Sequence, residues 1–491
     1  MRSSGILIPI TSLPSKYGIG TVGQEAYDFV DFLAKCKQKY WQILPIGPTG
    51  YGDSPYQSFS TYAGNPYLID LDMLVSDGLL SRGEIEKSGL IEDPDFIDYG
   101  DLYEKRFELL GKAAVRLDSL NKNFLSFCAR HSEWLGNYAL FMSLKQEYGM
   151  GSFHYWPEKY RIYHTGILEE TGGRLKDRMH FWSALQYLFY KQWNKFRTYA
   201  NRKGVKIIGD VPIYVSPDSS DLWVNHELFQ VDENRMMTNV AGCPPDFFNE
   251  TGQLWGNPLY NWRYHKKQKY EWWIKRLNHA GTFFDVVRID HFRGFSGYYS
   301  IPADHDTAMN GKWKRGPGKK LISKIKSDVP HIMIIAEDLG FLTWNVRRLL
   351  KYSGFPGMKV LQFAFDYSED SEYLPHKYMK NSVVYTGTHD NPTTCEWINS
   401  VLPRETKFIK KYLILDDAAN LTNELVKTAM DSNSNLCIIP IQDWLELGAE
   451  ARINIPGTAQ GNWKFRVRKE MLSEELAQKI LRLTESSGRA D

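Results

Sequence analysis

The residues most suited to chemistry are carboxylates that end short apolar runs. Asp290 ends the run Phe284–Asp290, and Arg288 stands two residues before it. In a strand, both side chains would lie on the same face. An Arg at that spacing keeps the carboxylate ionised and holds it in place. Covalent catalysis on a sugar requires such a carboxylate, although a structural Arg–Asp pair that closes a strand is a common alternative.

Three further carboxylates, Asp210, Glu337 and Asp390, also fall at the ends of predicted strands. Two carboxylates are enough to cleave a glycosidic bond with retention, because one attacks the anomeric carbon and the other protonates the leaving oxygen. Asp290 is the better nucleophile, since Arg288 supports its charge. Glu337 follows an apolar run, where desolvation raises a carboxyl pKa and suits a proton donor. Asp390 would bind sugar hydroxyls as the ring distorts. Alternatively, each carboxylate could cap a following helix.

Eight strand-like segments alternate with helical segments along the chain, which predicts an α/β fold of the (β/α)8 barrel type. In that fold the functional site lies at the carboxyl ends of the strands, where these four carboxylates fall. The predicted strands are Gly5–Ile10, Tyr40–Ile46, Val205–Val215, Phe284–Asp290, His331–Glu337, Met358–Phe365, Val383–Thr388 and Leu436–Ile441.

Two stretches are too long for simple connections between barrel strands, so we expect one elaborated barrel over residues 1–491 with two insertions. Residues 48–203 are mostly helical in pattern and would form an inserted subdomain plus a barrel helix. Residues 216–283 contain CPPDFFNETGQLWGNP, a Gly- and Pro-punctuated aromatic loop suited to covering a site.

The composition of the 491 residues argues against several classes of function. The net charge of +2 gives no basis for nucleic-acid binding, and no apolar run is long enough to span a bilayer. Five scattered cysteines favour reduced thiols in a cytoplasmic protein. The segments HDN and DHD do not have the residue spacing of a zinc site, so no metal is predicted. The sequence lacks GxxxxGK[ST], the motif that binds nucleoside phosphates, and no cofactor is predicted.

Aromatic residues are abundant, with 15 Trp, 29 Tyr and 25 Phe, and many stand beside Gly, Asn, Asp and Pro in predicted loops. The apolar faces of sugar rings pack on aromatic rings, while sugar hydroxyls need amides and carboxylates. The loops therefore suit a carbohydrate, and ordinary core aromatics are the alternative.

The segments VRIDHFRG, IIAEDLG and GTHDNPTT, in this order at strand ends, resemble the signature regions of the α-amylase superfamily. Four further segments narrow the resemblance to the 4-α-glucanotransferases, also called amylomaltases or disproportionating enzymes. They are GDVPIYV, SPYQ, LWGNP and GTAQGNW. The resemblance implies that Asp290 is the nucleophile, Glu337 the general acid/base and Asp390 the transition-state stabiliser. It also implies sugar contacts from Arg288, His389 and Asp210, stacking by Tyr56, a cover from Trp255 and an outer contact from Tyr51.

Strand alternation adds two expectations about neighbouring side chains. Asp338 should point away from Glu337. His389 should likewise point away from Asp390, unless a loop conformation at the strand end turns both inward.

The implied reaction transfers part of an α-1,4-glucan to the 4-hydroxyl of another glucan or of glucose, through a glycosyl–Asp290 ester. Its partners would be maltodextrins or fragments of glycogen or starch. A covering aromatic loop would favour transfer over hydrolysis by limiting water. An α-glucan hydrolase of the same superfamily and a non-catalytic glucan-binding scaffold are the rival interpretations.

Overall fold

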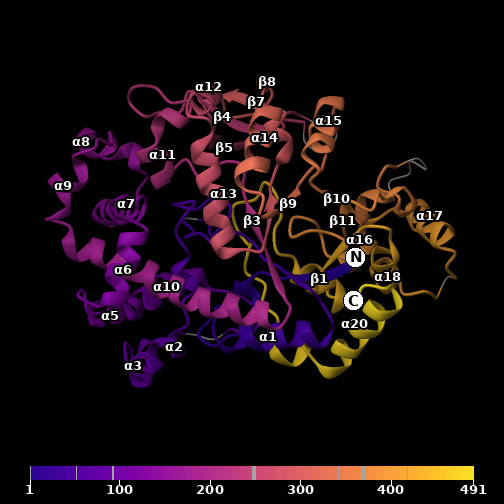
Figure 1. Ribbon diagram of the computed structural model, residues 1–491. Coiled ribbons are helices and arrows are strands. Elements are labelled where there is room, and N and C mark those ends of the chain that lie inside the picture. The colour runs from indigo at the N-terminus through magenta and orange to yellow at the C-terminus, as the bar shows by residue number, and fades with distance from the viewer. Residues whose placement is uncertain are drawn as a thin grey trace.

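The computed structural model describes residues 2–50, 52–90, 93–245, 250–340, 342–365, 371–416 and 418–490. At its centre, parallel strands close a barrel in the order β1-β12-β11-β10-β9-β6-β3-β2 (Figure 1). Each barrel strand coincides with one of the predicted segments, so the predicted (β/α)8 barrel is confirmed. The strands are β1 (Ser3–Leu7), β2 (Tyr40–Gln42), β3 (Lys206–Val211), β6 (Val286–Ile289), β9 (Met333–Ala336), β10 (Gly357–Val360), β11 (Ser382–Tyr385) and β12 (Leu436–Pro440).

The barrel strands read as continuous apolar runs because both of their faces are buried. Alternate residues belong to two separate hydrophobic clusters, one inside the barrel and one between the strands and the helices. The inner cluster includes Ile208, Val286, Ile335 and Ile438, and the outer cluster includes Ile207, Val287, Ile334 and Ile439.

The outer helices form a layer in which successive helices contact one another around the barrel. The contacts run from α20 to α1, α10, α13, α14 and α15, and from α16 through α18 back to α20. Arg489, which follows α20, donates to the carbonyl of Ser3 in β1 at 2.9 Å, so the two chain ends lie side by side (Figure 1). The bounds are α1 (Gln24–Lys35), α10 (Lys176–Arg202), α13 (Glu271–Phe283), α14 (Lys319–Asp328), α15 (Trp344–Ser353), α16 (Thr394–Ser400), α17 (Pro403–Leu413), α18 (Leu421–Asp431), α19 (Ile441–Trp444) and α20 (Glu474–Ser486).

The chain between β2 and β3 is mostly helical and extends to one side of the barrel (Figure 1). Within it, α7 and α5 pack on α10, which also belongs to the barrel layer. The remaining helices are α2 (Leu71–Ser76), α3 (Arg82–Ser88), α4 (Tyr99–Asp101), α5 (Phe107–Arg116), α6 (Lys122–Arg130), α7 (Leu135–Glu147), α8 (Glu158–Arg161) and α9 (Ile167–Gly172). Across the described ranges, no helix has both the length and the apolarity needed to cross a membrane.

The chain between β3 and β9 contains a second sheet, which the sequence patterns did not predict. It is antiparallel, in the order β5-β4-β7-β8. Its strands are β4 (Asn239–Cys243), β5 (Gln253–Pro258), β7 (Gly297–Pro302) and β8 (Lys312–Arg315), and the short helices α11 (Ser220–Val224) and α12 (Trp262–Lys267) lie in the same stretch. Trp255 therefore stands on a paired strand and not in a free loop, which corrects the expectation for LWGNP.

The register of the barrel brings the predicted site residues to one rim. Asp210 in β3 pairs with Arg288 in β6, and Ile289 pairs with Ala336 in β9. Asp290 and Glu337 are the next residues along these two strands, and the Glu337 N–H donates to the Ile289 carbonyl at 2.9 Å. Both carboxylates thus leave the barrel at the same level.

Candidate active site

A cavity of about 520 Å³ lies at the carboxyl ends of the barrel strands, and we refer to it as the cleft. Its lining comes from the ends of β6 and β9, from the turn after β11 and from loops that cover the barrel rim. The predicted residues Tyr56, Trp255, Arg288, Asp290, Glu337 and Asp390 line it.

Arg288 joins two of the carboxylates. Its Nη2 lies 3.0 Å from Oδ1 of Asp290, and its Nη1 donates to Oδ2 of Asp210. The Arg288 side chain is 3% exposed, whereas that of Asp290 is 28% exposed and reaches the cleft. Burial raises the pKa of Asp290 to about 6, against the opposing effect of the Arg288 charge. Arg288 therefore fixes the position of Asp290 and keeps its pKa from rising further.

Glu337 occupies a different setting from Asp290. Its Oε2 accepts from the His291 N–H at 2.6 Å and its Oε1 from the Leu339 N–H at 2.7 Å. His291 can present that N–H because it takes a left-handed conformation with φ of 52°. Burial and the negative charge of Asp290 raise the pKa of Glu337 to about 7. A carboxyl group with this pKa can both give and take a proton near neutral pH.

Asp390 is held by two neighbours. Nε2 of His389 lies 3.3 Å from its Oδ2, and Nδ2 of Asn454 donates to its Oδ1 at 2.6 Å. Burial would raise the pKa of Asp390, but His389 and the hydrogen bond from Asn454 hold it well below the usual range. Asp390 therefore stays ionised at the pH at which Glu337 exchanges a proton.

Tyr56 connects these groups on one side of the cleft. Its hydroxyl donates to Oδ2 of Asp210 at 2.6 Å and lies 2.7 Å from Nε2 of His389. The Tyr56 and His389 rings stack at 5.4 Å, and Trp463 lies 6.0 Å from Tyr56. Trp255 packs edge-on against His291 at 4.8 Å.

The structure brings together eight of the nine residues singled out from the sequence, and Tyr51 lies outside the described residues. Asp210 and His389, each 3% exposed, lie behind the cleft surface and contact residues that line it. The sequence interpretation missed Asn454, His291 and Trp463. Trp463 belongs to the GTAQGNW segment, which carried part of the resemblance, but Asn454 stands in no quoted motif.

The family described as 4-alpha-glucanotransferase matches residues 8–472 of the sequence. The chain belongs to this family. A 4-alpha-glucanotransferase from Clostridium butyricum is 44% identical over 485 residues, which cover 98% of this chain and 100% of that protein. One from Thermus thermophilus is 42% identical, covering 99% of each chain.

One solved structure agrees with this membership of the 4-alpha-glucanotransferase family, and a second shares the fold. The amylomaltase from Streptococcus agalactiae, solved in complex with acarbose, superposes with a TM-score of 0.97 at 40% identity over 100% of both chains. The amylomaltase from Corynebacterium glutamicum is only 18% identical and shares the fold, with a TM-score of 0.81 over 98% of this chain and 75% of that one.

Proposed function

We propose that this 4-alpha-glucanotransferase moves a segment of an α-1,4-glucan to the 4-hydroxyl of an acceptor glucan or glucose by a retaining double displacement. The observation that carries the proposal is the placement of Asp290 and Glu337 at the same level of adjacent strands, facing one cleft. Their surroundings differ in the way that a nucleophile and an acid/base require.

In the first step, a carboxylate oxygen of Asp290 attacks the anomeric carbon and Glu337 gives its proton to the leaving glycosidic oxygen. The bond to that oxygen breaks, the shortened glucan leaves with a free 4-hydroxyl, and a glycosyl–Asp290 ester remains. In the second step, ionised Glu337 takes the proton of an acceptor 4-hydroxyl, whose oxygen displaces Asp290 from the anomeric carbon. The two inversions give net retention, and both side chains return to their starting states.

The other cleft residues take supporting roles in this proposal. Asp390, which stays ionised, accepts hydrogen bonds from sugar hydroxyls that tighten as the ring distorts. Arg288 positions Asp290, and Tyr56 offers an aromatic face to the sugar beside the cleaved bond. Trp255, on β5 at the edge of the cleft, covers the acceptor side and limits water. The amylomaltase from Streptococcus agalactiae was solved in complex with acarbose, which supports a glucan substrate for this protein.

Product analysis from maltotriose alone tests the proposal. Transfer gives a ladder of maltodextrins both longer and shorter than the substrate, and added glucose shifts the ladder towards short products. Glucose and maltose in a simple hydrolytic ratio would instead identify an α-glucan hydrolase. A Glu337→Gln variant that still produced the ladder at the wild-type rate would remove the proposed mechanism.

A further inference from the structure

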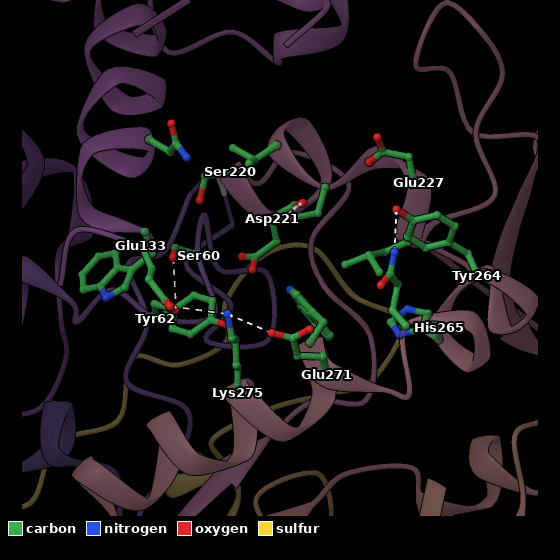
Figure 2. Close-up of a pocket in the computed structure, with 17 residues that line it drawn as sticks. Ser60, Tyr62, Glu133, Ser220, Asp221, Glu227, Tyr264, His265, Glu271 and Lys275 are labelled. Carbon is green, nitrogen blue, oxygen red and sulfur yellow. Dashed lines mark hydrogen bonds and ion pairs between the residues drawn. The ribbon is translucent and has the colours of Figure 1, made fainter. Parts of the chain in front are cut away.

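A second cavity, of about 430 Å³, lies between α7 and the helices α11, α12 and α13 (Figure 2). We refer to it as the lateral pocket. It shares no lining residue with the cleft, so it is a separate site. None of the residues given a catalytic or sugar-binding role above lines it.

Aromatic side chains form much of the lateral pocket. The rings of Trp134 and Tyr62 are nearly parallel, at 16°, with their centroids 6.0 Å apart. Tyr264 and Trp272 also line the pocket, and the buried Nε1 of Trp272 has no hydrogen-bond partner among the described residues. Trp134, Tyr62 and Tyr264 are each partly exposed, so part of each side chain reaches the pocket.

Each carboxylate that lines the lateral pocket has a partner within the protein, and for Glu227 it is Nε2 of His226 at 3.4 Å. Lys275 lies 3.4 Å from Glu133 and 3.2 Å from Glu271 (Figure 2). Asp221 accepts from the backbone N–H of Thr61 at 2.8 Å and from its hydroxyl at 2.7 Å. Because these carboxylates have partners within the protein, a neutral ligand can bind without leaving a buried charge unpaired; four carboxylates beside one lysine also suit a cation, which the experiments below distinguish.

Uncharged polar groups also line the pocket, among them the amides of Asn137, Asn225 and Gln268 and the hydroxyls of Ser60 and Ser220. Aromatic faces beside amides and carboxylates are the groups that a sugar ring needs, since its C–H faces are apolar and its hydroxyls both donate and accept. We propose that the lateral pocket binds a stretch of α-glucan as a second site, remote from the reacting atoms. The choice of α-glucan over another neutral sugar rests on the proposed function.

The segment from Tyr56 to Tyr62 connects the two sites, because Tyr56 lines the cleft and Tyr62 lines the lateral pocket. Six residues span at most about 22 Å of extended chain, which bounds the distance between these two positions. When one part of a long glucan is held in the lateral pocket, the rest of that chain stays near the cleft, so its local concentration there is raised. The benefit should grow with the length of the glucan, so long substrates should gain more than maltotriose.

Calorimetry with maltotriose on an Asp290→Asn background, which prevents turnover, measures the number of sites. We expect two sites per chain, and we expect Trp134→Ala or Tyr264→Ala to weaken one of them about tenfold or more while the other is unchanged. Trp344→Ala is the matched control, because Trp344 is 67% exposed on α15 and does not line the pocket. A single site in the background protein, or two sites that persist unchanged in both pocket variants, would overturn the proposal.

Activity provides a second measurement on the otherwise unaltered enzyme. Trp134→Ala should raise KM for amylose about three- to tenfold, while kcat and the rate on maltotriose stay within about twofold of wild type. Equal losses on both substrates would contradict the inference, as would displacement of maltotriose from the pocket by tetramethylammonium, which would identify a cation site. Failure of the proposed function has a separate signature, the absence of a product ladder from maltotriose with wild-type enzyme.

Discussion

The cleft and the lateral pocket are of similar size and composition, with about 520 and 430 Å³ of space and a mixture of aromatic and carboxylate side chains. They differ in what holds the carboxylates. In the pocket, Glu133 and Glu271 share Lys275, and Asp221 accepts hydrogen bonds from the backbone N–H and the hydroxyl of Thr61, which oppose the rise in its pKa that burial causes. In the cleft, backbone N–H groups hold Glu337, and its pKa is raised to about 7. A site of this composition becomes catalytic when one of its carboxyl groups can exchange a proton near neutral pH.

The two sites also differ in the rigidity of the elements that support them. The acids of the cleft leave barrel strands whose register fixes their level, whereas the pocket is built from helices and one loop. Placement on a rigid sheet gives the precision that bond making requires, while binding tolerates a looser frame.

The largest effect should come from Asp290→Asn, which removes the nucleophile. We expect turnover to fall by about 10⁴-fold or more, with glucan binding and stability nearly unchanged. Product analysis with maltotriose measures the first quantity, and calorimetry and thermal unfolding measure the others. Asp221→Asn is the matched control from the lateral pocket, since it changes a carboxylate that holds Thr61. The Asp221→Asn variant should be less stable than the wild type and retain most of its activity. An equal loss of activity in the two variants would contradict the contrast between the cleft and the lateral pocket.

The next effect tests the proton exchange at Glu337. The general acid must be protonated, so kcat/KM should fall as the pH rises above about 7, and the nucleophile must be ionised, so it should fall as the pH drops below about 6. Glu337→Gln should lower kcat/KM about 10²- to 10⁴-fold and abolish the alkaline limb. A pH–rate profile measures both limbs, and an alkaline limb that survives in the variant would assign that limb to another group.

Arg288→Met should act on both stability and activity, because it leaves Asp210 and Asp290 without their shared cation. Removing one partner of a buried ion pair costs about 3–5 kcal/mol, which urea unfolding would measure. The pKa of Asp290 should rise, so the acid limb of the pH profile should move to higher pH. Arg347→Met breaks an exposed pair with Glu372 and should cost less than about 1 kcal/mol. Similar losses in the two variants would show that the Arg288 bridge contributes no more than a surface pair.

The sequence predicted the barrel because its strands are short, apolar and separated by helical patterns. The predicted ends were less accurate, since Val205–Val215 and Met358–Phe365 run past the last paired residues of β3 and β10. Most of the extra residues are buried, in a loop after β3 and in a 3-10 helix (Leu361–Ala364) after β10, and burial alone does not distinguish these from a strand. The sheet of β4, β5, β7 and β8 escaped prediction because the pairing of β4 with β7 joins segments far apart in the chain and because β8 is exposed along its whole length, so it has no apolar run.

The alternation of side chains along a strand correctly predicted that Asp338 points away from Glu337. In its simple form it wrongly predicted that His389 points away from Asp390. Asp338, the residue after Glu337, turns away and accepts from the Met358 N–H at 2.7 Å, as alternation predicts. His389 and Asp390 lie beyond the end of β11 at Tyr385, in a turn that brings their side chains within 3.3 Å of each other. Alternation holds at Glu337 because its N–H continues the strand pairing to the Ile289 carbonyl, whereas His389 stands four residues beyond the end of β11, so the sequence could not place His389 and Asp390.

The smallest effect should come from Asn454→Ala, which extends the comparison to the third carboxylate of the cleft. Asn454 donates to Oδ1 of Asp390, and a hydrogen bond to a charged group contributes about 1.5–3 kcal/mol. Part of this energy is lost because water can replace the amide at the partly exposed Asp390, so we expect kcat to fall about tenfold with a smaller change in KM. Asn454 would then be a positioning residue for Asp390. Asn454→Asp places a second carboxylate beside Asp390 and should be worse than Asn454→Ala. If instead the two variants reduced kcat only in proportion to lost thermal stability, Asn454 would be structural, and the proton exchange of Glu337 alone would distinguish the cleft from the pocket.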